Sequence, residues 1–192
     1  MSERGLLCEN CGLWTPPFRG VRMPVDQQEC IVVGVVRGQA DAVLRRAVEY
    51  AQKFDAVLVC ANVDATRYTV TENADGTVTS LPLNPELADL REEQFDPGLR
   101  EYLDGVLSGH TVSWTTRALA GNPARSLARL AETLDAAMIV VGTREANLRG
   151  TVREFLAGSV AVHLAHHQHR PVVVIPQDPQ PADRTLPWED AI

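Results

Sequence analysis

The sequence predicts an α/β fold, an open, doubly wound and mostly parallel sheet of five strands with helices on both faces. Short apolar runs typical of strands buried on both faces alternate with segments whose apolar residues recur at helical spacing, and this order indicates βαβ units. The chain has 192 residues, of which 45% are hydrophobic and 22% are charged, close to the averages of folded globular proteins. One domain of ordinary size is therefore expected.

The first half of the chain predicts two buried strands, a helix between them and a hairpin. The apolar runs 31–36 and 56–63 predict the strands, and Cys60 within the second is an expected core residue. Between the runs, the apolar residues with helical spacing are Val43, Leu44, Ala47, Val48 and Ala51. Two threonine-rich runs at 69–71 and 77–79 flank the tight-turn sequence 73–76, which predicts a polar hairpin inserted between core elements.

Two helices of the second half are predicted from their first residues. Asp96 and Asn122 suit N-cap positions, and each is followed by a proline, which is tolerated in the first helical turn because its missing N–H would be unpaired there anyway. Three further strands are expected at 112–119, 137–141 and 171–176. The run 112–119 alternates in polarity, so we expect this strand to be less buried than the others.

The pattern divides the chain into three parts. Residues 1–29 have no periodicity and predict an irregular extension, residues 30–176 form the domain with an insertion at 68–94, and residues 177–192 read as a C-terminal tail rich in Pro, Asp and Gln. Cys8 and Cys11 supply half of a tetrahedral zinc site at most, so a metal or redox role for the extension stays open beside a plain tail.

Composition and motifs exclude several classes of function. The net charge of -7 disfavours nucleic-acid binding, which relies on clustered Lys and Arg. No run of about 18 apolar residues predicts a membrane span and the first residues do not resemble a secretory signal, so we expect a cytoplasmic protein. Dinucleotide-binding, P-loop and nucleophile-elbow motifs are missing, so efficient catalysis is not expected. His163 and His167 have a spacing that can share a metal, but no Glu or Cys accompanies them, and no metal site is predicted.

The most informative segment runs from Gly142 to Ser159. It follows a predicted strand, enters a helix, and carries Gly142, Gly150 and Gly158-Ser159. Glycines let the backbone approach a ligand closely, and free N–H groups at a helix start can bind phosphate oxygens. A structural interpretation also stands, because Thr151 and Glu154 form a capping box and the glycines could serve turns alone.

This segment, the strand after it, the first strand and the turn 121–124 resemble the universal stress protein family over about residues 30–176. The resemblance implies the adenine nucleotide alpha hydrolase-like fold. Members that bind ATP carry a glycine loop three residues shorter than the one here, and they usually end the first strand with an aspartate, where this chain has Val36. In those members, residues at the end of the second strand flank adenine, which implies the same role for Val63.

The resemblance implies a universal stress protein that binds ATP, with or without Mg, or a related adenine nucleotide as a regulatory stress-response sensor. The alternatives are a structural or protein-interaction member without nucleotide and, third, a weak ATPase. A homodimer is expected through the strand Val172–Ile175, whose apolar edge needs a partner. We refer to the following residues as the predicted nucleotide site: Val35, Val36, Val63, Gly142, Thr143, Arg144, Gly150, Gly158, Ser159 and Val160.

Overall fold

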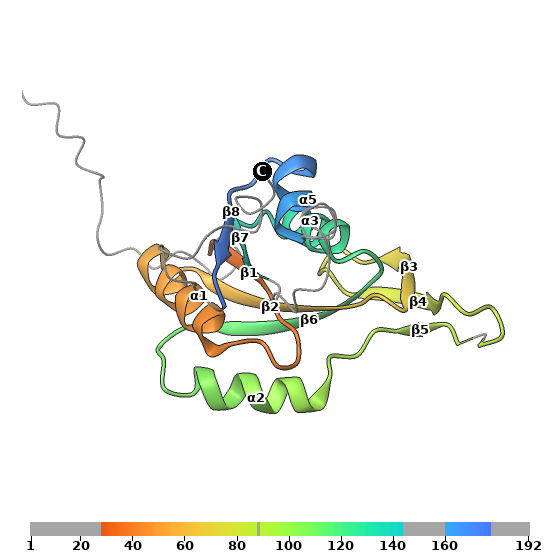
Figure 1. Ribbon diagram of the computed structural model, residues 1–192, viewed down its shortest axis with the longest axis horizontal. Coiled ribbons are helices and arrows are strands. Elements are labelled where there is room, and N and C mark those ends of the chain that lie inside the picture. Colours follow the sequence, from red (N-terminus) through yellow and green to blue (C-terminus); the bar gives the residue numbers. More distant parts are fainter. Residues whose placement is uncertain (1–27, 88, 144–159, 178–192) are drawn as a thin grey trace, which may run out of the picture.

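The computed structural model describes residues 28–87, 89–143 and 160–177 (Figure 1). It confirms the predicted α/β fold, with a five-stranded parallel sheet in the order β6-β2-β1-β7-β8. The elements that build this sheet and its two faces are β1 (Cys30–Gly34), α1 (Asp41–Phe54), β2 (Val57–Asp64), α2 (Pro97–Leu107), β6 (Trp114–Ala120), α3 (Pro123–Thr133), β7 (Met138–Gly142), α5 (Val160–His167) and β8 (Val172–Ile175).

Helices cover both faces of the sheet, α1 and α2 on one side and α3 and α5 on the other (Figure 1). Successive side chains of a strand point to opposite faces, so Ile31 and Val33 join the core under α1 and α2, while Val32 joins the core under α3 and α5. All three side chains are fully buried. This two-sided burial explains why the central strands read as continuous apolar runs. β6, at an edge of the sheet, is mostly half-buried, as its alternating sequence predicts.

Both predicted helix caps are present. The Asp96 carboxylate accepts a hydrogen bond from Leu99 N at 2.6 Å, and Asn122 Oδ1 accepts one from Arg125 N at 3.1 Å. Each cap pairs one of the backbone N–H groups that a helix start leaves without a partner. Asn122 thereby fixes the direction in which α3 leaves β6, which places the start of α3 beside the carboxyl ends of the central strands.

The predicted hairpin is confirmed as β3 (Arg67–Glu72) and β4 (Val78–Pro82), and a short third strand, β5 (Arg91–Glu92), extends it to a separate antiparallel sheet. The buried Arg67 guanidinium holds this sheet together, since its Nε lies 2.7 Å from both Ser80 Oγ and Glu93 Oε1. Thr69 Oγ1 donates to Ala120 O at 3.0 Å and ties the insertion to β6.

The carboxyl ends of β1 and β7 form the topological switch point, because the chain passes from β1 to β2 on one side and later returns to β7 on the other. β1 ends at Gly34, two residues before the end predicted from the apolar run, and Val36 is 53% exposed. The prediction of a buried strand to Val36 was therefore wrong at its end, because the chain has already left the sheet there. Among the described helices, none is long and apolar enough to cross a membrane.

Candidate functional site

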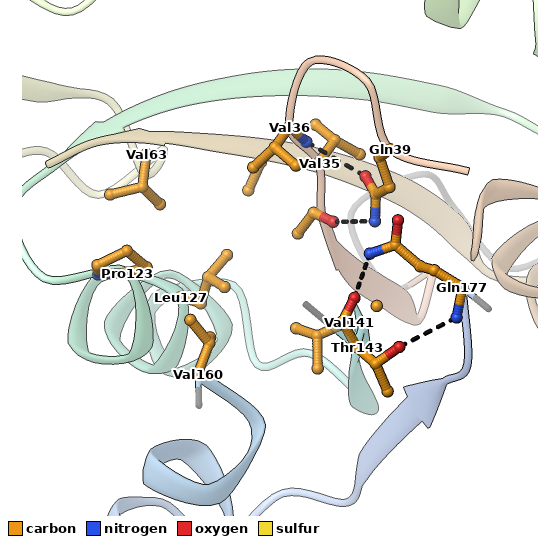
Figure 2. A pocket seen from close by; sticks show the side chains of 13 residues that line it. Val35, Val36, Gln39, Val63, Pro123, Leu127, Val141, Thr143, Val160 and Gln177 are labelled. Carbon is orange, nitrogen blue, oxygen red and sulfur yellow. Dashed lines mark hydrogen bonds between the residues drawn. The ribbon is translucent and has the colours of Figure 1, made fainter. Parts of the chain in front are cut away.

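A pocket of about 210 Å³ opens at the switch point, between the ends of β1, β2 and β7 and the start of α3 (Figure 2). Ligands of open α/β sheets bind at this place because the loops on either side of the switch point diverge and leave a crevice. Its described lining consists of Gly34, Val35, Val36, Gln39, Ala61, Val63, Pro123, Leu127, Val141, Gly142, Thr143, Val160 and Gln177.

One end of the pocket is apolar. Val63 comes from the end of β2, Pro123 and Leu127 from the first turns of α3, and Val160 from the first residue of α5 (Figure 2). Pro123 and Leu127 lie four residues apart and so share one face of their helix. This arrangement offers a slot of aliphatic side chains that suits a flat, weakly polar ring.

Hydrogen bonds hold in place the residues that follow β1 and line the pocket, Val35 and Val36. Val35 N donates to Ala61 O and the Asn62 side-chain amide donates to Val35 O, both at 2.8 Å. These bonds link the chain to β2 for one more residue after β1 ends at Gly34. They fix the turn that carries Val36, whose exposed side chain lines the pocket.

Gln39 forms part of the opposite, polar end. Its Oε1 accepts from Val36 N at 3.2 Å, its Nε2 donates to Gly34 O at 3.2 Å, and the residue is 7% exposed. A buried amide with both ends paired is held rigidly, because moving it would leave polar groups without partners. Gln39 therefore closes the turn between β1 and α1 from the inside.

Gln177 completes the polar end from the other side of the switch point. Its Oε1 accepts from Ala40 N at 3.1 Å. Its Nε2 donates to Thr143 O, and its backbone N donates to Thr143 Oγ1 at 3.0 Å (Figure 2). Ala40 is the N-cap of α1 and offers no side-chain cap, so the Gln177 oxygen serves this helix start instead. The residue joins the end of β8, the end of β7 and the start of α1.

Gly142 is required by close packing in this arrangement. A Cβ at this position would lie 2.6 Å from Gln177 Nε2 and 3.0 Å from Val43 Cγ2. The glycine that the sequence assigns to phosphate binding thus also lets the Gln177 amide approach the β7 backbone.

Six residues of the predicted nucleotide site are described, and all six line this pocket: Val35, Val36, Val63, Gly142, Thr143 and Val160. The remaining four, Arg144, Gly150, Gly158 and Ser159, lie outside the described residues, as do the capping box, Cys8 and Cys11. The part that each residue plays in binding stays a prediction.

Sequence reasoning missed both glutamines. Gln39 stands in a polar turn, and Gln177 is the first residue of the stretch predicted as a C-terminal tail. The only sequence signal was position, since both follow strands of the sheet closely, at the edge where ligands bind.

The described part of the lining carries no ionisable side chain, so its chemistry is that of apolar contact and neutral hydrogen bonding. Thr143 supplies a hydroxyl, but no described base lines the pocket to activate it. Groups with shifted pKa values lie elsewhere. The hydrogen bond from Arg37 and the bond from Leu99 N lower the pKa of Asp96, and burial raises the pKa of Cys60 to about 12.

Comparison with solved structures shows the same fold in universal stress proteins. A universal stress protein solved in complex with cAMP has a TM-score of 0.52 and 21% identity, over 79% of this chain and 98% of its own. A universal stress protein from Archaeoglobus fulgidus DSM 4304 has a TM-score of 0.52 and 16% identity, over 78% of this chain and 44% of its own.

Sequence comparison gives the same result. Universal stress proteins of Mycobacterium bovis and Mycobacterium tuberculosis are each 38% identical over 80 residues, which is 42% of this chain and 24% of theirs. The match thus spans about a quarter of the length of these curated relatives. The model of the universal stress protein family matches residues 29–176, well over half of the chain. The chain belongs to the universal stress protein family.

Proposed function

We propose that this chain binds an adenine nucleotide, ATP or a related one, as a regulatory ligand in a stress response. The observation that carries the proposal is the open pocket at the switch point, which combines an aliphatic slot with a polar end and holds every described residue of the predicted nucleotide site. The family neighbour solved with cAMP supports an adenine nucleotide as the class of ligand.

In this proposal the adenine ring lies between Val63 and the α3 residues Pro123 and Leu127, and the sugar and phosphates point toward Gly142 and Thr143. Aliphatic walls favour the ring because its faces are weakly solvated. The described space of about 210 Å³ is smaller than the roughly 300–1,000 Å³ of a pocket for a drug-sized ligand, so it suits the base, the sugar and the first phosphate, with any further phosphates extending past Thr143.

A sensor fits the pocket better than an enzyme. A phosphoryl-transfer site needs cations and a group that orients the nucleophile, and the described lining supplies neither. We therefore propose that occupancy, not turnover, is the output, in a cytoplasmic protein. Weak ATP hydrolysis remains the third hypothesis, tested by phosphate release from the purified chain.

The test begins with the full chain purified from cells, denatured and searched for released nucleotides by mass spectrometry. Thermal unfolding is then followed with ATP, AMP, cAMP and, as a control base, GMP. At a ligand concentration 100 times Kd, binding adds about 2.7 kcal/mol of stability, and a chain of this size should melt about 5–10 °C higher.

A matched pair of variants locates the site. Val63→Trp should fill the slot and abolish the shift, whereas Val70→Trp, at an exposed valine on β3 away from the pocket, should leave it unchanged. If no nucleotide is released and none shifts the melting temperature, the proposal is wrong and the protein-interaction alternative takes its place.

We also propose a homodimer through β8, which among the described strands pairs only with β7 and in which Val174 is 43% exposed. An open apolar edge strand favours pairing with a second chain. Light scattering should show a dimer for the wild type, a monomer for Val174→Lys and a dimer for the control Val70→Lys. A monomeric wild type would contradict the proposal.

A further inference from the structure

The polar end of the pocket carries side-chain amides that can donate hydrogen bonds. Because Gln39 Oε1 and Gln177 Oε1 each accept from a backbone N–H, the orientation of both amides is fixed, and each Nε2 must face a backbone carbonyl. An amide nitrogen carries two hydrogens, and each of these nitrogens makes one bond among the described residues. Among the described residues, one N–H of each side chain therefore has no partner and can donate to a ligand.

Thr143 adds a third donor. Its Oγ1 accepts from Gln177 N at 3.0 Å, and no other described residue accepts the hydrogen of this hydroxyl, which can therefore donate to a ligand. Gln39, Thr143 and Gln177 all line the same end of the pocket (Figure 2). We call these three side chains the donor cluster.

The donor cluster is rigid and uncharged. Every oxygen and nitrogen of the two amides is bonded to the backbone at or just beyond the ends of β1 and β7 or at the start of α1. The described residues contain no buried side-chain polar atom without a partner. Fixed donors need no reorganisation when a ligand arrives, so they favour a group that accepts hydrogen bonds at this place. A carboxylate at the same position would favour ligand hydroxyl and amino groups instead.

A nucleotide has one apolar, flat end and one end rich in oxygen, and the pocket has one aliphatic end and the donor cluster. We infer that Gln177 and Gln39 are specificity-determining residues whose free amide N–H groups bind phosphate oxygens of the nucleotide. This inference rests on the proposed function, and it goes further by assigning the phosphate end to two side chains outside the glycine-rich segment.

The test compares the affinities of adenosine, AMP and cAMP by calorimetry for the wild type and for Gln177→Met and Gln39→Met. Methionine keeps the length of the side chain but cannot donate. Hydrogen bonds to charged groups contribute more than neutral ones, so each variant should bind AMP and cAMP about tenfold more weakly. Adenosine, which lacks phosphate, should bind each variant within about twofold of the wild type, and this binding also shows that the variant pocket is folded.

Gln168→Met is the matched control. Gln168 also bonds the backbone through both ends of its amide, to Arg170 N and O, but it lies outside the pocket lining. It should leave all three affinities unchanged. If Gln177→Met does not fold, Gln39→Met carries the test.

Two failures are distinguishable. A wild type that binds AMP or cAMP while the glutamine variants lose nothing, or lose adenosine equally, overturns the inference and leaves the proposed function standing. A wild type that binds neither AMP nor cAMP, and whose melting temperature ATP does not shift, overturns the proposed function itself.

Discussion

Replacing Gly142 with alanine is expected to destabilise the fold by about 2 kcal/mol through a single contact. The new Cβ would lie 2.6 Å from Gln177 Nε2, closer than real Cβ atoms approach their neighbours, so the amide must move. Moving it breaks its bonds to Ala40 N and Thr143 O, each of which contributes about 1 kcal/mol net. The second near contact, at 3.0 Å from Val43 Cγ2, adds a smaller overpacking cost.

A double-mutant cycle isolates this contact. Gln177→Ala alone should cost about the same 2 kcal/mol, since it removes the same two bonds. Gly142→Ala should then cost little in the Gln177→Ala background, which gives a coupling energy of about 2 kcal/mol between two positions far apart in sequence. Urea denaturation measures the free energies of unfolding, and thermal melts should fall by about 4–8 °C for each single variant.

Gly105→Ala is the control, because a Cβ at this position in α2 would meet no atom within 4 Å. Alanine in a helix interior should stabilise the protein by about 0.5–1 kcal/mol relative to glycine. The reasoning is refuted if Gly142→Ala unfolds within about 0.5 kcal/mol of the wild type, or if it costs as much without the Gln177 amide as with it.

Three further predictions concern caps, protons and thiols. Asn122→Ala should lower the free energy of unfolding by about 1 kcal/mol by removing the cap of α3, and Asn122→Asp should keep it; an unchanged urea midpoint for the alanine variant would contradict this. The bonds from Arg37 and Leu99 N lower the pKa of Asp96, so its contribution to stability is present above the unfolded-state pKa of about 3.9 and is lost as pH falls through the lower native pKa. Asp96→Asn should flatten this part of the stability profile between about pH 5 and pH 2, and an identical profile for both proteins would refute the assignment. Burial raises the pKa of Cys60 to about 12 and also raises that of Cys30, so iodoacetamide should label both thiols only after denaturation; full labelling of native Cys60, read by peptide mass spectrometry, would be the contrary result.

Local patterns in the sequence determined most of the fold. The continuous apolar run from Ile31 reflects a strand that is buried on both faces. The helical spacing around Val43 and Leu44 reflects a helix that is buried on one face. Each kind of burial gives a pattern of apolar residues that can be recognised in the sequence. The caps Asp96 and Asn122 could be predicted because each acts on a backbone N–H three residues away. The position of the pocket also followed from the order of strands and helices.

Only the tertiary structure decided how the polar end of the pocket is made. Gln177 reaches Ala40 across 137 positions and Thr143 across 34, and no periodicity links such residues. The same holds for Arg67, a charged residue in a polar hairpin. It becomes buried because Ser80 of β4 and Glu93, which directly follows β5, both lie against its guanidinium. A sequence states which groups can donate or accept hydrogen bonds, but which of them meet depends on how the strands and helices pack, and that packing placed two glutamines beside the predicted nucleotide site.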